Sequence, residues 1–88
     1  MQFILEELRK RTQVPIIAIY KHPKDYPDKY VARVFDIDQP TFLAVTADTL
    51  EEIRGCIPEG MRRVPRSELD AKEIVESWIM IESILAMP

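Results

Sequence analysis

The sequence is poor in cysteine and glycine and has no long apolar run. Its one cysteine, Cys56, excludes an internal disulfide and a zinc-binding cluster of thiolates, which is typical of a reducing compartment. Two glycines are too few for a glycine-rich phosphate loop or a dinucleotide-binding fingerprint. The longest apolar stretch, Val14 to Tyr20, contains Pro15 and is far shorter than the ~20 residues of a membrane-spanning helix. The sequence therefore predicts no disulfide, no zinc site and no membrane segment.

The N-terminal residues do not match a secretory signal peptide, because the basic residues follow the first apolar residues instead of preceding them. We therefore expect a cytoplasmic protein. The 88 residues, of which 47% are apolar and 31% charged, predict one globular domain over 1–88.

The charge is slightly acidic and unevenly distributed. With 12 Lys and Arg against 15 Asp and Glu, the net charge is −3, whereas dedicated nucleic-acid binders usually carry a basic excess. Residues 9–33 are mainly basic and residues 67–88 mainly acidic. The two regions could face different partners, or face each other in an oligomer.

The pattern of apolar residues predicts a short amphipathic helix over 2–12, followed by strands over 14–20, 30–37 and 41–47. A loop over 21–29 and a turn over 38–40 connect these strands, and the second and third strands should form a hairpin.

A second helix begins near Thr49. Thr49 and Glu52 have the spacing of a capping box, and so do Asp48 and Glu51, so that either pair could bind the free N–H groups at the helix start. The helix is limited to about two turns by the proline and glycine at positions 58 and 60.

The segment 74–85 is compatible with two structures. Its β-branched residues favour a strand over 74–81, whereas its apolar spacing also fits a helix face that extends to Leu85. We predict the strand. The fold class is then α+β, with the order α-β-β-β-α-β and a small, mostly antiparallel sheet that has helices packed on one face.

Residues suited to catalysis are few. His22, the only histidine, lies in a loop with Asp25, Tyr26 and Asp28, where a His–Asp acid–base pair or a metal site is conceivable, but no known ligand spacing is matched. Prolines and aspartates in such a loop are typical of a turn. Cys56 has no histidine close in sequence and is more typical of a buried apolar residue than of a nucleophile. We predict a protein that is not an enzyme and has no metal or cofactor.

Arg62, Arg63 and Arg66 form the most concentrated positive charge in the sequence. Three guanidinium groups on a short, proline-containing segment could bind phosphates or carboxylates in bidentate fashion. The alternative, which the acidic net charge favours, is an exposed loop whose arginines pair with carboxylates close in sequence, such as Glu59 and Glu68.

Trp78, Met80 and Ile81 belong to an apolar segment that either completes the core or forms an interface. A small domain has too little interior to cover both faces of such a strand. A terminal strand with an open edge could also pair with its twin across a two-fold axis. The sequence therefore predicts a homodimer or a larger homo-oligomer.

The segments HPKDYPDKYVAR (22–33), ADTLEEIR (47–54) and IVESWI (74–79) resemble a group of short bacterial and prophage-encoded proteins without an assigned function. This resemblance implies a bacterial or prophage origin and a terminal strand. The segment DTLEE (48–52) is similar to the helix start of the HicB-like antitoxin domain, in which it follows a hairpin strand. That second resemblance implies toxin neutralisation or operator binding.

Taken together, these features predict a non-enzymatic protein-interaction module that self-associates, with a further protein partner not yet identified. The alternative is a HicB-like antitoxin or a nucleic-acid-binding protein that uses Arg62, Arg63 and Arg66. A small enzyme built on His22 ranks last.

Overall fold

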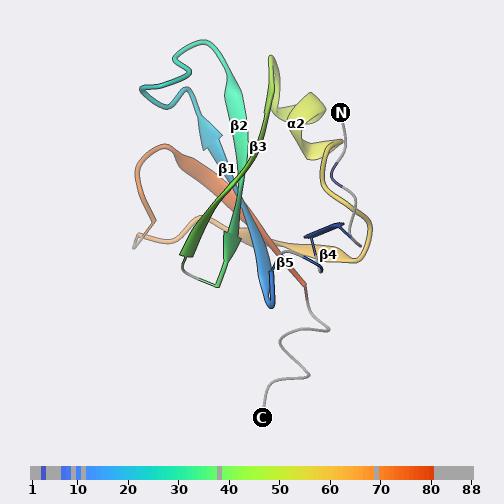
Figure 1. Ribbon diagram of the computed structural model, residues 1–88. Coiled ribbons are helices and arrows are strands. Elements are labelled where there is room, and N and C mark those ends of the chain that lie inside the picture. Colours follow the sequence, from blue (N-terminus) through green and yellow to red (C-terminus); the bar gives the residue numbers. More distant parts are fainter. Residues whose placement is uncertain are drawn as a thin grey trace.

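In the residues that it describes, the computed structural model is a small antiparallel sheet with the short helix α2 (Figure 1). It describes residues 3, 7–8, 10, 12–37, 39–68 and 70–80. The elements within this part of the chain are β1 (Pro15–Lys21), β2 (Tyr30–Asp36), β3 (Gln39–Ala47), α2 (Leu50–Arg54), β4 (Met61–Pro65) and β5 (Ile74–Met80).

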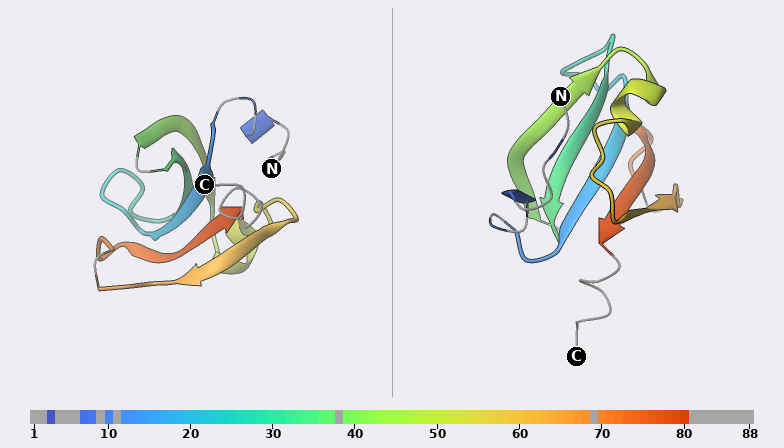
Figure 2. Two further views of the ribbon diagram at one scale, coloured as in Figure 1. Left: turned by 90° about the horizontal axis from the view of Figure 1, so that it is seen from below. Right: turned by 90° about the vertical axis from the view of Figure 1, so that its right-hand side faces the viewer.

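The strands lie in the order β3-β2-β1-β5-β4, and each neighbouring pair is antiparallel. β1 is central and pairs with β2 on one side and β5 on the other, while β3 and β4 are the two edges. The strands twist relative to one another, so that the sheet curls around the core (Figure 2). β5 is an inner strand, so the idea that this strand pairs with its twin through an open edge is wrong.

The expected α+β class with helices packed on one face is also wrong. The fold is β-rich, with five strands and about 11% helix. The predicted helix over 2–12 falls mostly outside the described residues, although Thr12 N donates to the Leu8 carbonyl oxygen at 2.8 Å, a helical hydrogen bond. The segment 61–65, expected to be a loop, is strand β4 because it pairs along its length with β5.

The other predicted strands are confirmed. β1, β2, β3 and β5 lie within one or two residues of the expected bounds, and the strand at 74–80 excludes the helical alternative there; Ile81 and Leu85 lie outside the described residues. The turn after β2 comes earlier than expected, at Ile37, since Gln39 and Pro40 already belong to β3.

The start of α2 confirms Thr49 as the N-cap. Thr49 Oγ1 accepts a hydrogen bond from the Glu52 N–H at 3.1 Å, whereas Asp48 pairs with Lys29. α2 packs against β2 and β3 and buries Ile53 completely. Burying such a side chain stabilises the fold by roughly 1.5–3 kcal/mol.

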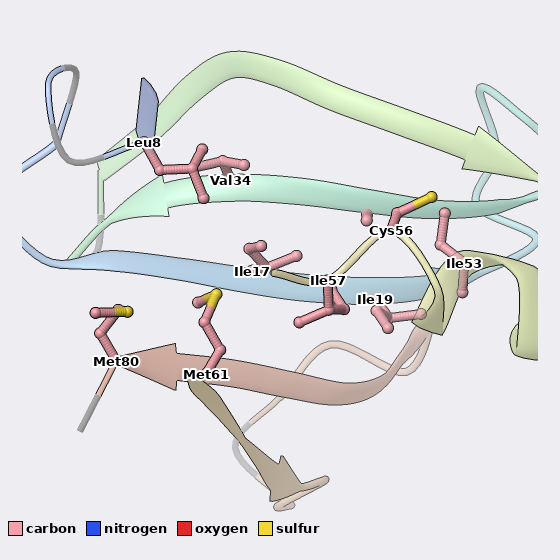
Figure 3. Packing of buried hydrophobic residues seen from close by; sticks show 10 residues of the cluster. Leu8, Ile17, Ile19, Val34, Ile53, Cys56, Ile57, Met61 and Met80 are labelled. Atoms are coloured by element: carbon pink, nitrogen blue, oxygen red, sulfur yellow. The ribbon is translucent and has the colours of Figure 1, made fainter. Parts of the chain in front are cut away.

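The hydrophobic core lies on the face of the sheet that α2 covers (Figure 3). Side chains of β1 and β2 meet there with those of α2 and the segment that follows it. The buried cluster consists of Leu8, Ile17, Ile19, Ala32, Val34, Ile53, Cys56, Ile57, Met61 and Met80. Cys56 is 5% exposed and contributes to this packing as a small apolar residue. No helix among the described residues is long and apolar enough to span a bilayer.

Candidate functional site

The structure does not gather the three predicted arginines into one patch. In β4 the residues alternate between the two faces of the sheet, so Arg62 lies on the outer face opposite Ile79, and Arg63 lies on the core face opposite Trp78. Arg66 follows the end of β4, and all three arginines are exposed. Only Arg63 forms an ion pair within the described part of the chain, and its partner is not one of the carboxylates close in sequence.

That partner is Glu76, a carboxylate buried on the core face of β5. Glu76 is 2% exposed. Its Oε1 accepts from Arg54 Nη2 at 2.6 Å, and its Oε2 accepts from Trp78 Nε1 at 2.8 Å and from Arg54 Nε at 3.2 Å. Arg63 Nη1 lies 4.0 Å from Oε1. Two guanidinium groups, from α2 and β4, therefore converge on one carboxylate oxygen, and we call these four residues the Glu76 cluster.

The Glu76 cluster keeps its carboxylate ionised. Burial alone would raise the pKa of Glu76, but the hydrogen bonds from Arg54 and Trp78, together with the positive charges of Arg54 and Arg63, lower that pKa below its ordinary value of 4.5. Glu76 in turn raises the pKa of Arg54. At neutral pH the cluster thus holds two positive charges and one negative charge.

Sequence reasoning missed Arg54 and Glu76. The two residues are 22 positions apart, and only the packing of α2 onto the sheet brings them together. The one signal for them in the sequence is the single acidic residue within the apolar run of β5.

The predicted interface residues lie largely inside the protein. Met80 is 1% exposed and belongs to the core, Trp78 is partly buried against it, and Ile81 lies outside the described residues. Large apolar side chains are exposed elsewhere: Tyr26, Ile37, Phe42 and Val64. Phe42 has the highest exposure of these, at 107%.

Ile37 and Phe42 both lie on the β2–β3 hairpin, and together with the exposed Pro40 we call them the hairpin tip. Ile37 has a φ of 60°, a left-handed conformation that a β-branched residue adopts only at a cost of about 1–3 kcal/mol. The turn is held in place by Asp36, whose Oδ1 accepts from the N–H groups of Gln13 and Val14 at 3.0 Å each. Strain that the surrounding contacts maintain in this way is a common property of binding sites.

A β-bulge lies beside Phe42 in β3. The register of β2 and β3 shifts between Arg33 and Phe35, and the Thr41 hydroxyl bridges the irregularity. Thr41 Oγ1 donates to the Val34 carbonyl oxygen at 2.7 Å and accepts from the Leu43 N–H at 3.1 Å. Phe42 follows the regular alternation of β3, in which Thr41, Leu43 and Val45 are half-buried and Phe42, Ala44 and Thr46 are exposed.

The two edges of the sheet differ in composition. β3 is nine residues long and contains no charged residue, whereas β4 has five residues that include two arginines and a proline. Short length, charge and proline are the usual features that prevent an edge strand from pairing with another chain. β4 has all of them, while β3 has a proline only near its start and the bulge at Phe42.

The structure does not combine His22 with a carboxylate. The His22 ring packs edge-on against Tyr30, with ring centroids 5.4 Å apart, and Asp25 pairs with Arg33. The hydrogen bond from Arg33 lowers the pKa of Asp25. The described residues include no group of three or more His, Cys, Asp or Glu side chains placed to hold a metal ion.

Comparison of the chain with protein-family models, with curated proteins and with solved structures found no match. The resemblances to short prophage proteins and to HicB-like antitoxins therefore remain predictions.

Proposed function

We propose that this protein is a non-enzymatic interaction module, of bacterial or prophage origin and working in the cytoplasm, that self-associates through the hairpin tip and the edge of β3. The observation that supports this most is the full exposure of Phe42. A phenylalanine side chain gains about 1.5–3 kcal/mol when it is removed from water, and Phe42 lies on the same hairpin as the exposed Ile37.

Hydrogen bonds next to the hairpin tip support its suitability for binding. Asp36 accepts bonds from the N–H groups of Gln13 and Val14, and the Thr41 hydroxyl donates to the Val34 carbonyl oxygen, so the residues beside Ile37 and Phe42 are tied to the neighbouring segments. A surface that is ordered before binding loses little conformational entropy in the complex, and aromatic side chains are common energetic centres of interfaces.

A second copy of the chain is the partner that fits this surface. Each copy has a net charge of −3, which opposes association only weakly, and β3 contributes no charged residue to that repulsion. Antiparallel pairing of β3 with β3 of a second copy around a two-fold axis would bring identical, uncharged strands together and would place Phe42 beside side chains of the partner strand.

Light scattering over a range of concentrations tests the proposal. We expect the mass of the native protein to rise from monomer to dimer with concentration, and Phe42→Ser to keep it monomeric. The matched control is Val64→Ser, which removes an exposed apolar side chain from the opposite edge, β4, and should leave the dimer intact. A monomeric mass of the native protein at all concentrations would refute self-association.

Cysteine crosslinking tests the surface itself. Ala44 is exposed on β3, and the native Cys56 is buried, so Ala44→Cys should form a disulfide-linked dimer under mild oxidation. The same change at Val64 on β4 should not. Crosslinking at Val64 alone would place the contact on the other edge and overturn the assignment to β3.

A further inference from the structure

The Glu76 cluster leaves two arginines with unused hydrogen-bond donors. Arg54 contacts the carboxylate through Nε and Nη2, so its Nη1 is not engaged there. The Arg63 guanidinium comes no closer to Glu76 than 4.0 Å, and no hydrogen bond of this side chain is found within the described part of the chain. Glu76 therefore does not use all the N–H donors of either guanidinium group.

Burial in the cluster is uneven. The Glu76 side chain is 2% exposed, whereas those of Arg54 and Arg63 are 44% and 54% exposed. The charged groups of the cluster that are exposed to solvent are thus the two guanidinium groups. The net charge of the cluster is +1. An anion from solution therefore reaches the two exposed guanidinium groups before it comes near the buried carboxylate.

We propose that Arg54 and Arg63 form a binding site for one phosphate group. Each guanidinium is a planar fork that matches a pair of phosphate oxygens, and a tetrahedral phosphate can offer oxygens to two forks that come from different directions. A planar carboxylate has one pair of oxygens and fills one fork only. Glu76 acts as the positioning residue, because it holds Arg54 at the end of α2 and attracts Arg63 on β4 before any ligand binds.

The chain contains its own reporter for this site. Trp78 is the single tryptophan and donates its indole N–H to Glu76, so binding at the arginines should change its fluorescence. Inorganic phosphate titrated at constant ionic strength should give a saturable change in the native protein. Arg63→Gln should weaken binding at least tenfold, and Arg63→Lys, which keeps the charge but loses the fork, should weaken it less.

Arg62→Gln is the matched control. It removes the same charge from the adjacent position of the same strand, but on the outer face of the sheet, and should change phosphate affinity less than twofold. Both positions are exposed, and an unchanged circular dichroism spectrum would verify that each variant is folded. The absence of a saturable change in the native protein would overturn the proposal, and so would equal losses in the Arg62 and Arg63 variants.

A phosphate group can belong to a small phosphomonoester or to a nucleic-acid backbone. Phosphoserine and a single-stranded oligonucleotide, titrated under the same conditions, distinguish these sources. Tighter binding of the oligonucleotide that is lost in Arg63→Gln and retained in Arg62→Gln would assign a nucleic-acid backbone. Tighter binding of phosphoserine with the same dependence on Arg63 would assign a small ligand, whereas oligonucleotide binding that depends equally on both arginines would count against the site.

Discussion

Glu76→Gln tests whether the buried carboxylate stabilises the fold as an ion. The isosteric amide removes the negative charge and keeps one acceptor oxygen, so it weakens the bonds from Arg54 and Trp78 without opening a cavity. Hydrogen bonds to charged groups contribute about 1.5–3 kcal/mol each, and the cost of burying the ion offsets part of that gain. We therefore expect the free energy of unfolding to fall by about 2 kcal/mol at pH 7.

The effect of pH provides the sharper part of this test. Because the folded state lowers the pKa of Glu76 below 4.5, the ion pair stabilises the fold above that value, and the stabilisation is lost as the pH falls through the folded-state pKa. The glutamine variant cannot titrate at this position. The difference between the two proteins should thus shrink from pH 7 towards pH 4.

Urea unfolding followed by Trp78 fluorescence, at several pH values, measures this difference. Glu59→Gln, at an exposed position, is the control and should change stability by less than about 0.5 kcal/mol at every pH. A cost for Glu76→Gln that grows in acid would mean that burial dominates and that the pKa of Glu76 is raised. That result would refute the conclusion that the ionised carboxylate of Glu76 stabilises the fold.

Three further changes test local features of the fold. Ile37→Asn should raise the melting temperature by about 4–8 °C, since asparagine tolerates the left-handed backbone at this half-exposed position; an unchanged or lower value would argue against strain in the turn. Thr49→Ala should cost about 1 kcal/mol in urea unfolding because the helix loses its N-cap, and equal costs for Asp48→Ala and Thr49→Ala would contradict the assigned N-cap. Ile53→Ala should cost about 2–5 kcal/mol through the cavity it leaves, and a cost below 1 kcal/mol would show that α2 is not packed as described.

The strands that could be predicted are those whose own residues favour the structure they adopt. The β-branched run of β1 and the alternation in β2 indicate strands in any context, and the spacing of Thr49 and Glu52 marks a helix start through contacts within one turn. These signals depend only on residues close in sequence, so the sequence alone predicts the two strands and the helix start.

Features that depend on distant partners could not be predicted in this way. The arginines and proline of β4 are typical of a loop, and they form a strand because β5 offers a free edge. Arg63 faces the core side, which is unusual for an exposed arginine, since Glu76 lies there. Likewise, the hydrogen bond from the Thr41 hydroxyl to the Val34 carbonyl oxygen joins two strands, and the residues of β3 alone do not indicate it.

The strand order has a consequence for synthesis on the ribosome. β1 and β5, which pair at the centre of the sheet, come from opposite ends of the described chain. The β1–β2–β3 meander can form as soon as its residues emerge, but one side of β1 stays without a partner until β5 has also emerged. During that interval the apolar strand β1 presents an open edge, and a chaperone that binds extended apolar segments would find its target there.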